Sequence, residues 1–279
     1  MMKLKESDLS GFFSKGVVAH GVIKKNINFY SKDEKILYYD IFQCTDDKVW
    51  CYYNKLNLSG VVMPKLLECK DMGNICTLRQ EYVIGTKFVD WIKNNNIIFY
   101  LEQHLEFFDI LLGYQFYSYC LDNRLRIDFN LKNFIMKDHK LYLVDIMPPI
   151  FIDYDIVKNG KVYSEKISQL MDLYMNIDHQ IIGMIGYWIL DSLDNLSKVM
   201  EPYRRQKISA ILMKFIEHAN TFIEMYECDI CRINRNNIYN YADNYFFNRL
   251  YLLYEYIDNK IRFEDMMYLY NKRIHLPLN

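Results

Sequence analysis

The chain has 279 residues, of which 51% are hydrophobic and 25% are charged, and its formal net charge is −1. This composition supports a sizeable packed core and excludes an intrinsically disordered chain. The 34 Lys and Arg residues are balanced by 35 Asp and Glu residues. The chain therefore has no overall positive charge that would attract nucleic acid or an anionic membrane. We therefore expect neither nucleic acid nor a membrane as a partner.

The cysteines and the N-terminal segment indicate the compartment. The seven cysteines are odd in number and scattered, which does not suit a disulfide framework. The N-terminal segment lacks the apolar core of a signal peptide. The most apolar stretch, residues 181–190, is about half the length that a membrane-spanning helix needs. These features predict a cytoplasmic protein with reduced thiols. Cys228 and Cys231 form an isolated C-x-x-C pair, which we interpret as ordinary helix-packing cysteines and not as a metal site.

The first third of the chain has the pattern of strands, turns and one helix. Residues 12–25 contain two glycines among β-branched side chains. Residues 27–30 and 36–44 flank a short polar turn, which predicts a hairpin. Thr45 is a helix start, because its hydroxyl oxygen can accept a hydrogen bond from a free amide of the first turn. We expect this helix to end near Gly60.

Further strands are predicted at residues 65–69 and 76–83, with a turn between them. Most of the chain beyond Gly85 has helical periodicity. Apolar residues recur at spacings of three and four along residues 101–116, which is the pattern of one buried helical face.

A short β interlude at residues 134–144 separates that helix from a mainly helical region at residues 164–272. This order predicts an α+β fold with two lobes. The small antiparallel β-rich lobe comprises residues 1–84, and the larger, mainly helical lobe comprises residues 85–279.

One short segment carries the candidate chemistry. Asp128 and Asn133 are five residues apart, and Asp145 follows Asn133 by twelve residues across the predicted hairpin. Phosphoryl transfer needs a carboxylate that orients the attacking hydroxyl, and oxygen ligands that hold Mg²⁺ against the nucleotide phosphates. A tight hairpin between Asn133 and Asp145 would place both at one cleft.

This pattern of Asp-x-x-x-x-Asn, a hairpin and then Asp resembles the catalytic loop and metal-binding aspartate of the protein-kinase-like superfamily. It is most similar to the aminoglycoside and choline phosphotransferase branch. The resemblance implies that Asp128 is the catalytic base and that Asn133 and Asp145 bind Mg²⁺. It also implies ATP or another nucleoside triphosphate as cofactor, a nucleotide-binding N-terminal lobe, and an acceptor region in the helical lobe.

Residues 79–91 resemble the hinge of that family, where a strand ends, a glycine turns and a short helix begins. The resemblance implies that Glu81 and Val83 contact the nucleotide. Gly16 and Gly21 lie where a phosphate-covering loop is expected, because glycine lets backbone amides approach phosphate closely. Their spacing does not match G-x-G-x-x-G, and a role as turn or bulge glycines is at least as compatible with the sequence.

The sequence departs from the family at the lysine that holds the nucleotide phosphates from the third strand. Our alignment places Asp40 at that position, where a carboxylate would repel phosphate. Lys24, Lys25 and Lys35 lie on neighbouring strands and remain open as substitutes, and we include Lys25 in the candidate site.

Two further departures concern the catalytic segment. Arg126 stands where the family usually has a histidine, and Pro148 and Pro149 follow soon after Asp145. Two prolines stiffen the backbone, which argues against a regulated protein kinase. The departures favour a small-molecule kinase or a non-catalytic relative.

Three functions are therefore weighed. The first is an ATP- and Mg²⁺-dependent phosphotransferase that acts on a hydroxyl of a small molecule or peptide. The second is a pseudokinase-like binding or scaffolding module, and its main support is Asp40 together with the absence of the family's lysine–glutamate ion pair. The third is a helical interaction protein with a β-rich cap, which predicts no effect of nucleotide on stability.

Overall fold

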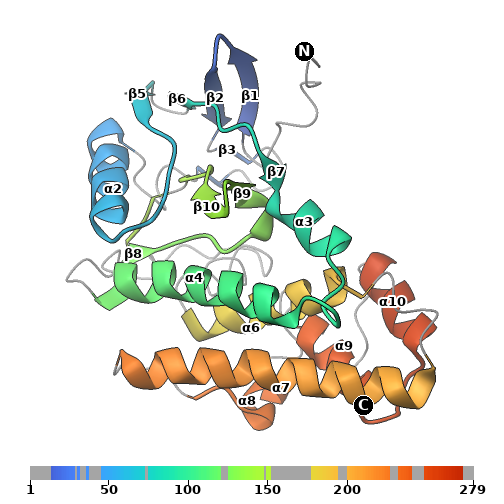
Figure 1. Ribbon diagram of the computed structural model, residues 1–279. Helices are drawn as coiled ribbons and strands as arrows, with labels where there is room; N and C mark the ends of the chain where they lie inside the picture. Colours follow the sequence, from blue (N-terminus) through green and yellow to red (C-terminus); the bar gives the residue numbers. More distant parts are fainter. Residues whose placement is uncertain are drawn as a thin grey trace.

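The computed structural model describes residues 14–28, 30–31, 36–37, 45–72, 75–120, 125–147, 149–151, 177–193, 200–226, 232–240 and 248–272. Antiparallel strands dominate the N-terminal part, and helices dominate the C-terminal part (Figure 1). The predicted α+β fold class is therefore confirmed. Asp40, Lys35, Pro148 and the pair Cys228 and Cys231 lie outside the described residues.

The first sheet consists of four antiparallel strands in the order β1-β2-β6-β5. The strands are β1 (Ser14–Ala19), β2 (Val22–Asn28), β5 (Leu66–Asp71) and β6 (Ile75–Glu81). A tight turn at His20 and Gly21 divides the β-rich stretch that the sequence predicted at residues 12–25. Both turn residues have positive φ, and glycine adopts that conformation without a steric penalty.

Side chains alternate between the two faces of this sheet. The buried positions are Ile23, Lys25 and Ile27 on β2, and Cys76, Leu78 and Gln80 on β6. Two polar side chains, Lys25 and Gln80, therefore lie on the face of the sheet that is otherwise apolar. Lys24 is exposed on the opposite face.

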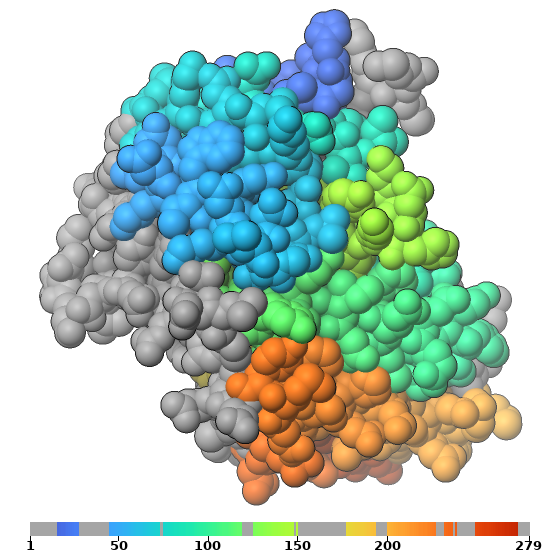
Figure 2. Space-filling view, turned by 60° about the vertical axis from the view of Figure 1, so that its left-hand side comes forward, coloured from blue at the N-terminus to red at the C-terminus, as the bar shows by residue number. Residues whose placement is uncertain are grey.

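Helix α2 (Asp46–Leu58) packs beside β5. The hydroxyl oxygen of Thr45 accepts a hydrogen bond from the Lys48 amide, so the predicted helix start is confirmed. The helix buries Val49, Tyr52 and Leu56 in the core. Figure 2 shows α2 (blue) on the outer side of the molecule, above α4 (green) and α7 (orange).

In the region of the predicted hairpin after β2, strand β3 (Tyr30–Ser31) pairs antiparallel with strand β4 (Ile36–Leu37). Within the described residues, these two strands pair with each other and not with the four-stranded sheet.

The chain leaves the first sheet after Glu81. Strand β7 (Thr86–Lys87) pairs with β9 (Phe134–Lys137), which forms a hairpin with β10 (Lys140–Leu143). This hairpin confirms the predicted β interlude. The predicted lobe boundary between residues 84 and 85 stays a prediction. Strand β7, which follows this boundary, belongs to the second sheet.

The helical part contains one long helix before the hairpin and several helices after it. The helix predicted along residues 101–116 is confirmed as α4, and the short helix expected to begin within residues 79–91 is α3. In the described part of the chain, the helices are α3 (Phe88–Asn94), α4 (Leu101–Cys120), α6 (Ile177–Asp191), α7 (Glu201–Met225), α8 (Arg235–Asn240), α9 (Asn248–Ile257) and α10 (Phe263–Lys272). Among these, none combines the length and the apolar character that crossing a membrane requires.

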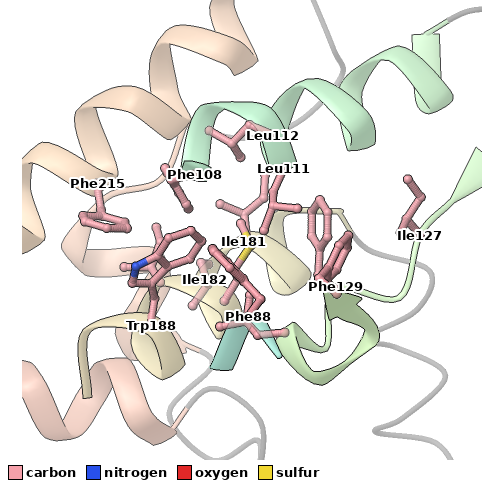
Figure 3. Close-up of a cluster of buried hydrophobic side chains, with 14 of the residues drawn as sticks. Phe88, Phe108, Leu111, Leu112, Ile127, Phe129, Ile181, Ile182, Trp188 and Phe215 are labelled. Carbon is pink, nitrogen blue, oxygen red and sulfur yellow. The ribbon is translucent and has the colours of Figure 1, made fainter. Parts of the chain in front are cut away.

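One hydrophobic cluster runs through both parts of the chain. In the helical part, the ring of Trp188 makes edge contacts with Phe88, Phe108 and Phe215 (Figure 3). Ile127 and Phe129 extend the cluster to the segment that contains Asp128. This segment is therefore fixed by its two apolar neighbours.

Candidate active site

Asp128 lies in a short loop whose backbone is held by strand pairing and by a hydrogen bond to α4. The loop begins at β8 (Leu125–Arg126), which pairs with β11 (Ile150–Phe151). The Ile127 amide donates a hydrogen bond to Gln115 Oε1 of α4 at 3.1 Å. Because Ile127 and Phe129 are buried, the intervening Asp128 is only partly exposed.

Asn133 ends the short 3₁₀ helix η2 (Leu131–Asn133) and contacts the Asp128 backbone. Asn133 Nδ2 donates to the Asp128 carbonyl oxygen at 3.3 Å, and the Asn130 amide donates to Asp128 Oδ1 at 2.9 Å. The first bond uses the amide nitrogen of Asn133. The side-chain oxygen of Asn133, which is the atom that a metal ion would contact, takes no part in that bond.

Asp145 follows β10 and lies beside Asn133. The Val144 amide donates to the Asn133 carbonyl oxygen at 2.8 Å, which joins the end of the hairpin to the end of η2. The Asp145 side chain is 26% exposed. Hydrogen bonds thus connect Asn133 both to the Asp128 carbonyl oxygen and to Val144, the residue before Asp145.

Lys25 reaches the same place from the first sheet. Its ammonium group lies 3.5 Å from Asp145 Oδ1 and donates to the Val144 carbonyl oxygen at 2.7 Å. Lys25 is only 7% exposed. Gly16 is its register partner on β1.

The strand pairing distinguishes Lys24 from Lys25, two of the lysines that the sequence left open as substitutes for the family's phosphate-binding lysine. β2 lies directly beside β6, and Lys25 on β2 faces the hairpin that leads to Asp145. Lys24 is exposed and lies opposite Arg79 in the register. Of the lysines considered, Lys25 is the one that the described residues place at the candidate site.

Gln80 is a site residue that our reading of the sequence missed. Its Nε2 donates to the Val144 carbonyl oxygen at 2.8 Å, and the residue is 2% exposed. A polar residue in phase with the buried Cys76 and Leu78 was the available signal, because period-two alternation places all three on one face. The hydroxyl of Tyr52, which donates to the Arg126 carbonyl oxygen, gave no such signal.

The remaining predicted residues form a second group at the crossing between the sheets. The Tyr82 amide donates to the Gly21 carbonyl oxygen at 2.8 Å, and Glu81 lies opposite Val22. Gly21 precedes Lys25 by four residues, or about 13 Å of strand. Their predicted contacts with the nucleotide stay predictions, as does the contact predicted for Val83, which is buried just after β6.

The donor set suits a hard divalent cation. Magnesium prefers carboxylate and amide oxygens, which Asp145 and Asn133 supply. In the part of the chain that the structure describes, no three His, Cys, Asp or Glu side chains gather as metal ligands. Asn133 and Asp145 therefore offer suitable ligand types, and their role as Mg²⁺ ligands stays a prediction.

Comparisons with known proteins add a structural similarity. No family model matches the chain, and no curated protein matches it. Among solved structures, the chain is similar to the crystal structure of choline kinase LicA from Streptococcus pneumoniae. The two sequences are 13% identical, the match covers 98% of this chain and 93% of that chain, and the TM-score is 0.37.

Proposed function

We propose that the chain is a kinase-like phosphotransferase that uses ATP or another nucleoside triphosphate with Mg²⁺. Its acceptor is a hydroxyl group of a small molecule or peptide. One observation carries this proposal: a buried lysine of the first sheet meets Asp145, and hydrogen bonds connect the backbone beside Asp145 to Asn133 and Asp128.

Each residue of the site has a distinct part in this proposal. Asp128 orients the acceptor hydroxyl and accepts its proton. Lys25 supplies a fixed positive charge for the nucleotide phosphates, and its burial keeps that charge poorly screened by water. Asn133 and Asp145 hold Mg²⁺, which when bound neutralises negative charge on the phosphates.

The two parts of the chain divide the substrates between them. Residues 1–84 bind the nucleotide, with Gly16, Gly21, Glu81 and Val83 lining its site. Residues 85–279 provide the catalytic loop and the acceptor region.

The test measures both binding and transfer. Purified protein is melted with ATP plus Mg²⁺ and with ATP plus a chelator, and transfer of labelled phosphate is followed across amino alcohols, aminoglycosides and peptides. We expect thermal stabilisation that depends on Mg²⁺, and transfer to at least one acceptor. Stabilisation without transfer to any acceptor would instead support a binding module.

The matched variants are Asp145→Asn and Asp138→Asn. Both remove one carboxylate charge, but Asp138 lies exposed in the turn at the far end of the β9–β10 hairpin. Asp145→Asn is expected to lower transfer by about 100-fold or more and to abolish the Mg²⁺-dependent stabilisation. Asp138→Asn should behave as the wild type, and full activity of Asp145→Asn would refute the assignment.

A further inference from the structure

Side chains of the N-terminal part hold two backbone carbonyl groups at the candidate site. The Tyr52 hydroxyl of α2 donates to the Arg126 carbonyl oxygen, two residues before Asp128. Gln80 Nε2 of β6 donates to the Val144 carbonyl oxygen, one residue before Asp145. The two contacts therefore lie immediately before the two carboxylates.

Both donors are deeply buried. Tyr52 is 1% exposed and Gln80 is 2% exposed. Burying a polar group is costly unless it is hydrogen-bonded, so each side chain favours the arrangement that keeps its carbonyl partner within reach. The acceptors lie 74 and 64 residues away in the sequence, in the part that follows the crossing. These contacts therefore couple the two parts of the chain at the site.

The backbone next to each carbonyl is held by other bonds as well. The Arg126 carbonyl and the Ile127 amide belong to one peptide unit, and Gln115 Oε1 of α4 accepts from that amide. The Val144 amide donates to the Asn133 carbonyl oxygen, and Lys25 also donates to the Val144 carbonyl oxygen. Each loop is thus clamped between the N-terminal part and the helical part.

We propose that Tyr52 and Gln80 are positioning residues, Tyr52 for Asp128 and Gln80 for Asp145. This inference rests on the proposed function, since it concerns the same site. Catalytic groups act well only within about 0.5 Å of their productive geometry. A shift of about 1 Å can lower a rate by about 100-fold. Through these two bonds, the position of α2 and the first sheet determines where the two carboxylates lie.

The two residues are expected to affect different kinetic constants. Asp128 acts on the acceptor hydroxyl in the transfer step, so Tyr52 affects kcat. Asp145 is a ligand for Mg²⁺, so Gln80 affects the concentration of Mg²⁺ needed for half-maximal rate. A purely structural role would lower the amount of folded enzyme and would not separate the two constants.

Two near-isosteric substitutions test this separation. Tyr52→Phe is expected to lower kcat by about tenfold, with the Mg²⁺ requirement nearly unchanged. Gln80→Met is expected to raise the half-saturating Mg²⁺ concentration by about tenfold, with a smaller change in kcat. Equal effects of both variants on both constants would overturn the proposal.

Matched controls come from neighbouring positions. Tyr53→Phe makes the same change on the same helix, where the Tyr53 hydroxyl donates to the Pro64 carbonyl oxygen at 3.4 Å and not to the Arg126 carbonyl oxygen. Gln103→Met makes the second change at an exposed position on α4. Both controls should retain the kinetic constants of the wild type, and a control that reproduces the effect of its site variant would contradict the proposal.

Amide hydrogen exchange provides a measurement that needs no activity. Tyr52→Phe should speed exchange in peptides covering residues 125–133, and Gln80→Met should speed it in peptides covering residues 143–147. If neither region changes, or if exchange rises uniformly, the positioning roles are refuted. If the regional changes appear but the wild type transfers no phosphate, the proposed function fails while the positioning roles stand.

Discussion

The β-rich part and the helical part both bury polar side chains, but the two sets of contacts differ in kind. In the sheet, Lys25 and Gln80 point from the buried face toward the Val144 carbonyl. In the helical part, His104 is hydrogen-bonded to both Trp188 Nε1 and the Asn95 carbonyl oxygen. Asn220 likewise exchanges two hydrogen bonds with the Ile233 backbone.

The difference separates groups that fix packing from groups that serve a site. The buried groups of His104 and Asn220 are neutral and paired, so they specify how helices and loops fit together. Lys25 instead keeps a charge that is nearly buried, and the carboxylate of Asp145 beside it is partly exposed. Retaining such a charge costs desolvation energy. We expect residues of the first kind to control stability and Lys25 to control activity.

The largest expected effect comes from breaking the charged contact. Lys25→Met should lower phosphate transfer by about 100-fold, because the cation for the phosphates is removed. The free energy of unfolding should fall only slightly, because the Asp145 carboxylate is partly exposed and Gln80 still donates to the Val144 carbonyl oxygen. Transfer assays and denaturant titrations measure the two quantities.

Lys24→Met is the matched control for that experiment, because the adjacent Lys24 is exposed on the other face of β2. It should leave transfer nearly unchanged. If Lys24→Met were as inactive as Lys25→Met, the charge of the lobe and not the placement of Lys25 would be responsible.

The pH dependence of stability tests the neutral contact in the helical part. Burial lowers the pKa of His104 to about 4, against an ordinary value near 6.5. Between these values the unfolded chain binds a proton that the folded chain does not. The contribution of His104 to the free energy of unfolding therefore falls as the pH drops from about 6.5 to 4, by about 3 kcal/mol in all.

Denaturant titrations between pH 4 and pH 8 measure this loss, and His104→Gln serves as the comparison. A glutamine can still accept one hydrogen bond and donate another, but it does not titrate. The variant should have a flatter pH profile over this range. An unchanged slope would show that other groups cause the loss.

The smallest expected effect tests the close packing of Gly85 against β9, where the two parts of the chain meet. A Cβ at Gly85 would lie 2.4 Å from the Met136 carbonyl oxygen and 2.7 Å from Ile135 Cγ2. Gly85→Ala should therefore lower the free energy of unfolding by about 1–3 kcal/mol. Thermal and denaturant unfolding measure this change.

Gly113→Ala is the control for Gly85→Ala. A Cβ at Gly113 meets no other described atom within 4 Å, and Gly113 lies inside α4. The variant should be more stable than the wild type by up to about 1 kcal/mol, because alanine favours a helix over glycine. Destabilisation of this variant would argue against the steric reason given for Gly85.

Features set by neighbouring residues were predicted well. Thr45 starts α2, and the apolar spacing along α4 matches its extent. The polar turn between β9 and β10 also lies where the sequence predicted it. In each case the pattern involves residues only a few positions apart, so the chain itself contains the necessary information.

The pairing of distant strands was not predicted. The sequence could not show that β2 lies beside β6, and it therefore left Lys24, Lys25 and Lys35 as alternatives. Gln80 was missed for the same reason, since its partner at Val144 lies on another element.

By itself, the sequence determined the kinds of elements, their order, and the spacing that brings Asp128, Asn133 and Asp145 toward one place. Only the tertiary structure showed that Lys25 meets Asp145, and that Tyr52 and Gln80 hold the backbone before Asp128 and Asp145. The physical reason is that periodicity fixes the face on which a side chain lies. Which group that face meets depends on strand pairing and packing between residues far apart in the chain.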